Sequence, residues 1–210
     1  MLQETEKVLH WELEPLPLEK NDNILCDDAL LTDWEDFVKR RATSPTYIIS
    51  NPPFQGYSKM TKEQKASLNC AMPNKIGNKK VWRNQGKMDF VCAWYAKAAE
   101  YMSEKKNVKC ALVSTNSITQ GEQVALLWKP LAQYYNLHIS FAWKTFRWYN
   151  EADDMAHVHC VIIGFGKQKK GEKCHIYQEG AHVVEASNIN GYLMGAEDFF
   201  LESRSEPLGK

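Results

Sequence analysis

The chain has 210 residues, and with 44% hydrophobic and 25% charged residues its composition is that of one globular domain, which excludes a disordered or fibrous protein. Lysine plus arginine and aspartate plus glutamate both number 26, so the molecule offers no net positive charge to nucleic acid, and DNA binding requires a local patch or a further module. The 6 cysteines are scattered without a Cys-x-x-Cys pair, and no signal peptide or long apolar run is present, which predicts reduced thiols, a cytoplasmic location and no membrane contact.

Residues 1–22 are charged and contain Pro15 and Pro17, which predicts a short arm or linker ahead of the first core element. Residues 23–26 are predicted to form a short strand, and Asp28 follows at its end. Two interpretations of this carboxylate are open: it caps the next turn, or it accepts a hydrogen bond from a nucleotide-like cofactor. Residues 32–37 then predict a helical turn.

The β-branched and aromatic run at residues 47–49 predicts a buried strand. Pro52 and Pro53 stop it, because proline neither donates to a β-ladder nor continues into a helix. Asn51 therefore stands at the carboxyl end of that strand, with Phe54 close behind it. Ligands bind at this edge of an open α/β sheet, so the amide, the stiff turn and the ring predict a site. A strand followed by a rigid turn without function is the alternative.

The chemistry that needs these residues is the activation of an amino group on a base, which is a weak nucleophile because its lone pair is delocalised into the ring. Two acceptors that take its hydrogens favour a pyramidal, reactive nitrogen, and the Asn51 side-chain oxygen and the Pro52 carbonyl are candidates. The two prolines hold that carbonyl in place before the substrate arrives. Phe54 would stack on the base, which implies a base that has left its duplex.

Residues 55–87 are polar and basic, and they predict a long loop that is functional or mobile. Lys79 and Lys80 are its candidates for contact with a DNA backbone, while a solvated loop explains the charges equally well.

Strand and helix patterns alternate in the next part of the chain. Residues 88–102 have helical spacing, with Asp89 near the amino end, where a carboxylate favours the helix dipole. Residues 110–114 predict a buried strand, and residues 121–135 predict a helix that Pro130 kinks or ends. This alternation favours a parallel, doubly wound α/β sheet over an all-β or bundle architecture.

Residues 138–143 and 156–165 predict two strands with no helix between them, which are expected to pair antiparallel. The loop predicted between them, residues 144–152, carries aromatic residues beside Lys144 and Arg147, as a stacking surface for bases would. Anchoring of this loop in the core by one of its aromatic residues is the alternative.

Residues 49–54 resemble motif IV of the amino-methyltransferases that act on adenine in DNA. Further blocks, in order and spacing, are similar to the methylase part of single-chain type II restriction-modification enzymes of the MmeI-like kind (type IIG/IIL). These blocks are residues 88–90, 113–123, 145–152, 159–165 and 188–193. The resemblance runs from about residue 23 onward, and ordered blocks are far more specific than one tetrapeptide.

The resemblance implies methyl transfer from S-adenosylmethionine to N6 of a flipped adenine in double-stranded DNA, directly and without a metal. It also implies a role for each matching position. The residues are Asn51, Pro52, Pro53 and Phe54 for the target adenine; Asp28, Ala29, Asp89 and Phe90 for the cofactor; Phe146 or Trp148 against the target base; and Lys144, Arg147, Lys79 and Lys80 for the DNA.

The chain departs from this family upstream of Asp28, where members carry a strand and a glycine-rich turn for the methionine part of the cofactor. Residues 1–20 contain no glycine. We therefore expect an incomplete cofactor site on a partial Rossmann-like class I methyltransferase sheet. That sheet is expected to be mostly parallel with a C-terminal antiparallel strand pair, and to lack its first strands.

The expected organisation is an arm at residues 1–22, an incomplete catalytic core at residues 23–178, and an extension at residues 179–210 leading toward a target-recognition region. The chain is thus expected to be a fragment that is inactive without the remainder of its parent polypeptide.

Three functions stay open. The first is the catalytic core of a DNA adenine N6-methyltransferase from a restriction-modification system. The second is a methyltransferase for a protein glutamine or another planar amino group, because the same tetrapeptide serves both chemistries. The third is a non-catalytic module that binds DNA or a partner subunit. The aromatic residues and the basic stretch favour DNA, whereas the zero net charge does not.

Overall fold

The computed structural model describes residues 24–38, 45–148, 158–169, 171–180 and 182–202. The predicted arm at residues 1–22 and the second half of the loop predicted at residues 144–152 lie outside these ranges. Within them, no helix combines the length and the apolar character needed to cross a bilayer.

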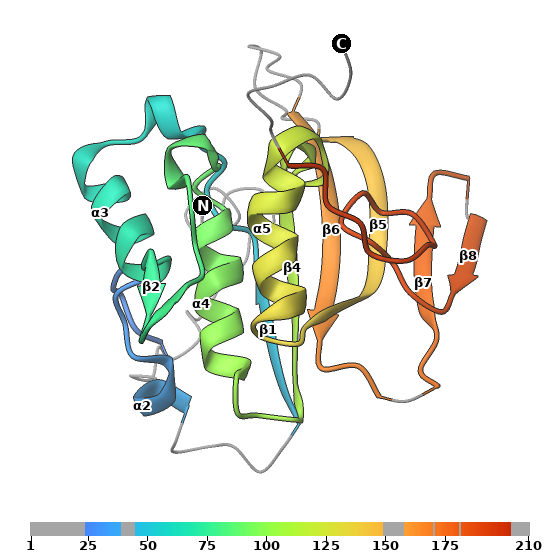
Figure 1. Cartoon of the computed structure of the whole chain (residues 1–210), viewed down its shortest axis with the longest axis horizontal. Coiled ribbons are helices and arrows are strands. Elements are labelled where there is room, and N and C mark those ends of the chain that lie inside the picture. The colour runs from blue at the N-terminus through green and yellow to red at the C-terminus, as the bar shows by residue number, and fades with distance from the viewer. Residues whose placement is uncertain (1–23, 39–44, 149–157, 170, 181, 203–210) are drawn as a thin grey trace, which may run out of the picture.

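The structure is built on a six-stranded sheet with the strand order β1-β4-β6-β5-β7-β8 (Figure 1). The strands are β1 (Thr46–Ser50), β4 (Val108–Thr115), β5 (His138–Trp148), β6 (Val158–Gly166), β7 (Cys174–Gln178) and β8 (His182–Ala186). β1 pairs parallel with β4, and β5 pairs parallel with β7. β6 lies antiparallel between β4 and β5, so β1, β4, β5 and β7 all run the same way. The predicted mixed sheet, mostly parallel with an antiparallel pair, is confirmed.

Helices α4 (Cys92–Met102) and α5 (Gly121–Gln133) cover one face of the sheet (Figure 1). α4 is rich in alanine, which favours a helix and lets it pack closely, and most of its side chains are buried. It begins later than predicted, at Cys92. α5 buries Leu127, Trp128 and Leu131 against the sheet, and Pro130 lies in its last turn as predicted.

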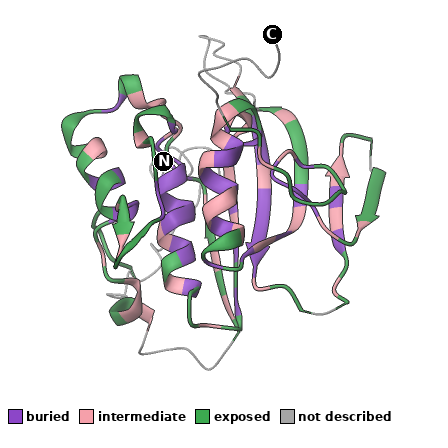
Figure 2. Ribbon diagram, viewed as in Figure 1, coloured by how far each residue is buried: buried purple, intermediate pink, exposed green. Residues whose placement is uncertain are grey.

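The opposite face of β1 is open. Burial alternates along this strand, and Tyr47 and Ile49 are 64% and 82% exposed while Ile48 packs against the core. By contrast, α4 is buried along most of its length (Figure 2). The prediction of a fully buried strand was therefore wrong for every second residue. The physical reason is that β1 is an edge strand whose far face no described element covers.

The prediction of a long loop at residues 55–87 was wrong. This segment contains α3 (Lys62–Ala71), the hairpin of β2 (Lys75–Ile76) and β3 (Lys79–Lys80), and the short 3-10 helices η1 (Tyr57–Lys59) and η2 (Gln85–Lys87). Thr61 and Gln64 form a reciprocal capping box at the start of α3. Leu68, Met72 and Trp82 are fully buried, so the segment is part of the core despite its charge.

Two further expectations need correction, and one pair of strands was missed. Residues 24–26 form no strand, and Ile24 and Leu25 are mostly exposed. The helical turn predicted after them exists as α2 (Trp34–Val38). β5 continues to Trp148, so residues 144–148 belong to a strand and not to a loop. Residues 146–148 pair with β6, and residues 144 and 145 lie at a shift in the register. The sequence analysis did not recognise residues 174–186 as two strands.

Candidate active site at the carboxyl edge of the sheet

The Asn51–Phe54 segment lies where the sequence places it, directly after the last residue of β1. Ser50, the last residue of β1, pairs with Leu112 of β4, and β4 continues beyond this pair to Thr115. Pro52 is buried, Phe54 is half-buried, and Asn51 is exposed. The rigid turn is thus anchored from inside and presents its amide outward.

No described residue donates a hydrogen bond to either of the two acceptors proposed for an amino group. Neither the Asn51 side chain nor the Pro52 carbonyl oxygen has a hydrogen-bond partner among the described residues. Phe90 N donates to the Gln55 carbonyl at 2.8 Å, which ties the segment after Phe54 to the residues just before α4. The turn is therefore held by its flanks, and neither acceptor is bonded to a described residue.

Asp89 is the centre of a hydrogen-bond network that joins four segments. Thr115 Oγ1 at the end of β4 donates to Asp89 Oδ2 at 3.0 Å, and Ser117 Oγ donates to the same oxygen. Gln123 of α5 donates from Nε2 to Asp89 Oδ1 at 3.3 Å and accepts from Asp89 N at 3.2 Å. A Cβ atom on Gly56 would lie 3.9 Å from Asp89 Oδ1, so the carboxylate also faces the segment that follows Phe54.

Ser117 lies on η3 (Asn116–Thr119), between β4 and α5. The sequence analysis assigned no role to Thr115, Ser117 or Gln123. The run of small polar residues at the end of β4 was a usable signal for the first two, because polar side chains at a strand's carboxyl end face the site. Gln123 gave no such signal, since its role depends on where α5 begins.

Two buried groups beside this network are held in their neutral forms. Burial, and to a smaller extent the Asp89 carboxylate, raise the pKa of the Cys92 thiol, whose Sγ lies 3.8 Å from Gln123 Oε1. Burial likewise raises the pKa of Tyr95, whose hydroxyl shares a 2.9 Å hydrogen bond with Ser114. The site therefore offers neutral hydrogen-bonding groups and no thiolate at neutral pH.

Asp28 occupies a structural position. Its Oδ1 accepts from Leu30 N at 2.9 Å, and its Oδ2 accepts from Ser67 Oγ at 2.8 Å, which fastens the turn at residues 28–32 to α3. Ala29 is exposed, and its carbonyl accepts from Trp34 Nε1 at 2.7 Å. The capping interpretation thus describes Asp28 in this structure, and a contact with a cofactor stays a prediction.

Phe90 is buried and packs edge-on against Trp94, with ring centroids 5.1 Å apart. Its backbone, through the hydrogen bond to Gln55, holds the site more directly than its ring does. Within the described ranges, no group of three or more His, Cys, Asp or Glu residues is placed to hold a metal ion.

The residues predicted to contact the target base and DNA fall in two places. Lys144, Phe146 and Arg147 lie in the last part of β5, where Phe146 is half-buried and the other two are exposed, and Trp148 ends the strand. Lys144 lines a depression of about 560 Å³ together with Thr119 and Gln120, next to the start of α5. The end of β5 and this depression therefore lie toward the edge of the sheet where β4 has its carboxyl end.

Lys79 and Lys80 lie elsewhere. They form β3 and line a second cavity on the outer side of α5. The structure thus brings Asp89 together with the segment after Phe54 and the end of β4, and it separates Lys79 and Lys80 from them.

The chain matches the family model described as MmeI, DNA-methyltransferase domain, over residues 1–178. It is 35% identical over 210 residues to DNA methyltransferase A of Bacillus subtilis (strain 168), and this match covers 99% of the chain and 23% of that protein. The solved structure of the Type IIL restriction-modification enzyme MmeI in complex with DNA matches 100% of the chain, with a TM-score of 0.79 and 39% identity. That match covers 27% of MmeI.

The chain therefore spans about a quarter of the length of each of these relatives. The family match covers most of the chain, and it confirms the resemblance drawn from residues 49–54 and the blocks that follow them. Together with the strand order and the turn at the end of β1, these matches show that the chain belongs to the family of MmeI DNA-methyltransferase domains.

Proposed function

We propose that the chain is the catalytic core of a restriction-modification DNA methyltransferase that transfers a methyl group from S-adenosylmethionine to N6 of a flipped adenine. The observation that carries this proposal is a pair of acceptors at the end of β1, Asn51 Oδ1 and the Pro52 carbonyl oxygen, that bond to no described residue. Membership of the family supports a DNA methyltransferase, and the complex of its relative MmeI with DNA supports DNA as the partner.

The residues of the turn act by positioning the adenine. Asn51 and Pro52 each accept one N6 hydrogen, which localises the nitrogen lone pair, and Phe54 stacks on the ring to hold it outside the duplex. When bound, the cofactor would supply an electrophilic methyl group on its sulfonium. The amino nitrogen would take that methyl group in place of one of its protons, which would leave to solvent. No covalent enzyme intermediate is required, which agrees with the neutral, buried thiol of Cys92.

Two carboxylates have acceptor capacity left for a cofactor. A carboxylate has about four lone-pair positions. Asp28 uses one on each oxygen, and it is exposed. Asp89 uses two on Oδ2 and one on Oδ1, which leaves one beside Gly56. Asp28 with Ala29, and Asp89 with the backbone of Phe90, are therefore proposed to hold the cofactor.

The exposed end of β5 is proposed to contact DNA. Lys144 and Arg147 place two cations there, and Phe146 or Trp148 would meet the target base. The depression that Lys144 shares with Thr119 and Gln120 offers hydrogen-bonding groups beside those charges. Lys79 and Lys80 are proposed to contact DNA further from the turn.

The test is the identity of the methylated product. The chain, and the same chain within its parent polypeptide, are incubated with tritiated S-adenosylmethionine and duplex DNA, and the digested nucleosides are separated. Label in N6-methyldeoxyadenosine is expected, and label in a cytosine product would contradict the proposal. A parallel incubation with a glutamine-containing peptide addresses the alternative acceptor, and label there without label in DNA would favour that function.

A further inference from the structure

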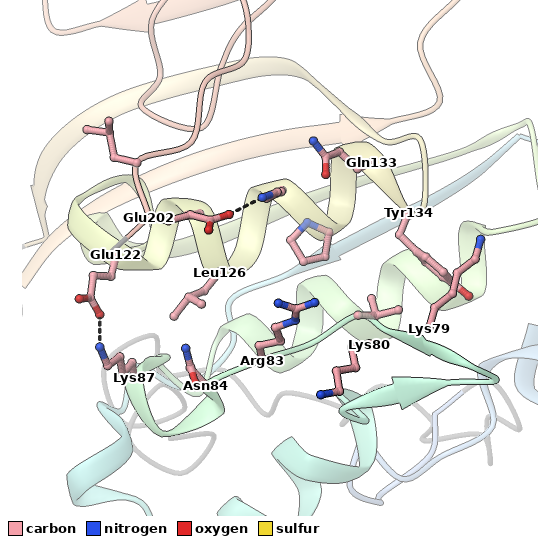
Figure 3. A pocket seen from close by; sticks show the side chains of 15 residues that line it. Lys79, Lys80, Arg83, Asn84, Lys87, Glu122, Leu126, Gln133, Tyr134 and Glu202 are labelled. Carbon is pink, nitrogen blue, oxygen red and sulfur yellow. Dashed lines mark hydrogen bonds and ion pairs between the residues drawn. The ribbon is translucent and has the colours of Figure 1, made fainter. Parts of the chain in front are cut away.

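A cavity of about 610 Å³ opens between α5 and the segment that runs from β3 to η2 (Figure 3). Small-molecule sites in proteins usually have volumes of about 300 to 1,000 Å³, so this one is large enough for a drug-sized ligand. The residues that decide its chemistry are Lys79, Lys80, Arg83, Leu126, Pro130 and Tyr134.

The cavity has more positive charge than its own carboxylates neutralise. Lys87 pairs with Glu122 at 2.6 Å, and Lys129 pairs with Glu202 (Figure 3). Both acidic side chains of the lining are thus already paired with a lysine. Lys79, Lys80 and Arg83 have no carboxylate partner among the described residues. A ligand for these three groups must therefore bring negative charge.

The α5 wall of the cavity has a different character. Leu126 and Pro130 are half-buried there, and Pro130 has no N–H group to offer a ligand. Tyr134 is 37% exposed, with the Lys79 ammonium 5.6 Å from its ring centroid. One wall is thus apolar and aromatic while the other is cationic, and a simple inorganic anion would leave the apolar wall without a contact.

We propose that this cavity binds a nucleotide, with Lys80 and Arg83 on its phosphate and with Tyr134, Leu126 and Pro130 against its base. Arg83 is suited to a phosphate because its guanidinium donates two parallel hydrogen bonds. The nucleotide is either free in solution or one unit of a DNA strand. Only the second source rests on the proposed methyltransferase function.

The cavity is adjacent to the candidate active site through the first turn of α5. Glu122 pairs with Lys87 on the cavity side, and its neighbour Gln123 bonds to Asp89. A nucleotide in the cavity would therefore lie beside the helix turn that holds Asp89, without occupying the acceptors of Asn51 and Pro52.

The experiment compares two probes, deoxyadenosine monophosphate and a short DNA duplex, by calorimetric titration at low salt. The double variant Lys80→Ala/Arg83→Ala removes the unpaired cations. Its matched control, Lys62→Ala/Lys106→Ala, removes the same charge from exposed lysines outside the cavity. Leu126→Trp places a bulkier side chain where the base is proposed to lie, without changing the charge of the cavity.

We expect the double variant to weaken binding of the mononucleotide by at least about tenfold, as the loss of charge-assisted hydrogen bonds implies, while the control stays within about twofold. Leu126→Trp should abolish mononucleotide binding. If the duplex is the true source, the double variant weakens duplex binding instead and the mononucleotide binds to no form. Equal losses in the double variant and the control, or no binding of either probe, would overturn the proposal.

The same proteins are titrated with S-adenosylmethionine, and their unfolding is followed by circular dichroism. If the Lys80→Ala/Arg83→Ala variant binds the cofactor and unfolds like the wild type, its loss of nucleotide binding comes from the cavity. It then does not come from damage to the proposed methyltransferase site. A variant that unfolds early is replaced by Lys80→Gln/Arg83→Gln, which removes the charges but keeps a polar side chain at both positions.

Discussion

At the scale of single residues, the candidate site contains side chains that are hydrogen-bonded to described residues and side chains that are not. Asp89 accepts three side-chain hydrogen bonds, whereas Asn51 accepts none from the described residues. A buried network of this kind is stabilising only when its members are satisfied. Substitution of Asn51 should therefore change the reaction rate, whereas loss of a partner of Asp89 should change the stability of the fold.

Replacing Asn51 by alanine should lower the rate of methyl transfer by roughly a hundredfold or more, because one preorganised contact to the reacting nitrogen is lost. Stability should not change, since the side chain bonds to no described residue. The rate is measured under single-turnover conditions in the active parent polypeptide, with Asn78→Ala on the exposed hairpin turn as control. A rate within a few fold of the wild type would remove Asn51 from the catalytic role.

Replacing Gln123 by alanine should destabilise the fold by about 1–3 kcal/mol, because Asp89 N and Asp89 Oδ1 lose their partner in a half-buried place. Gln133→Ala, on the same helix but exposed, should change the free energy of unfolding by less than about 0.5 kcal/mol. Urea denaturation measures both values. Equal stabilities of the two variants would show that Gln123 does not hold Asp89.

At the scale of elements, the apolar spacing along the chain predicted much of the fold. The polar composition of residues 55–87 led to the wrong prediction of a loop there. The strand ending at Ser50 and the helices α4 and α5 followed from their apolar spacing, and the turn at Asn51 followed from the two prolines. α3 was missed because its exposed face is so polar that Leu68 and Ala71 do not stand out in the sequence. The network around Asp89 was missed because its partners come from three segments that only the fold brings together.

The segment after β8 should depend on one glycine. A Cβ atom on Gly191 would lie 2.7 Å from Trp128 Cδ1 and 2.8 Å from Val124 Cγ1, both on α5. Gly191→Ala should therefore cost about 1–3 kcal/mol of stability, as overpacking usually does. At Gly86 a Cβ would meet only ordinary contacts at 3.7 Å, so Gly86→Ala is the control in thermal unfolding. Matching melting temperatures would contradict the close packing of this segment on α5.

The ion pair between β4 and the β6–β7 turn should give a pH-dependent contribution. The Lys109 ammonium, 2.7 Å from Glu172 Oε1, and then the Lys169 N–H hold the pKa of Glu172 below its usual value of 4.5. Because the folded pKa is the lower one, the stabilisation is present at neutral pH and is lost as the pH falls below that value.

Glu172→Gln should therefore lower the free energy of unfolding by about 0.2–1 kcal/mol at pH 7, the usual range for an exposed pair, and by less at a pH of about 3. Urea denaturation at the two pH values measures the difference, with the exposed Glu104→Gln as control. An equal decrease in the free energy of unfolding at both pH values would show that the charge of Glu172 is not its cause.

At the scale of the whole molecule, the sheet has helices on one side only in the described ranges, and β1 is one of its edges. Tyr47 and Ile49 expose a flat apolar surface beside the unpaired edge of a strand, which favours association with another chain. Ile49→Lys should reduce concentration-dependent self-association in sedimentation velocity. Ile24→Lys, at an exposed residue outside the sheet, adds the same charge as control. An equal effect of both changes would assign the association to net charge.

The antiparallel strand β6 has a consequence for the order of folding. It is the partner of both β4 and β5, yet it follows both of them in the chain. On the ribosome, the two strands that flank the centre of the sheet emerge before the strand that must separate them. The central pairings thus wait for β6. Until residues 158–166 have emerged, β1 is the native neighbour available to β4 among the described strands, and β5 has no native neighbour among them.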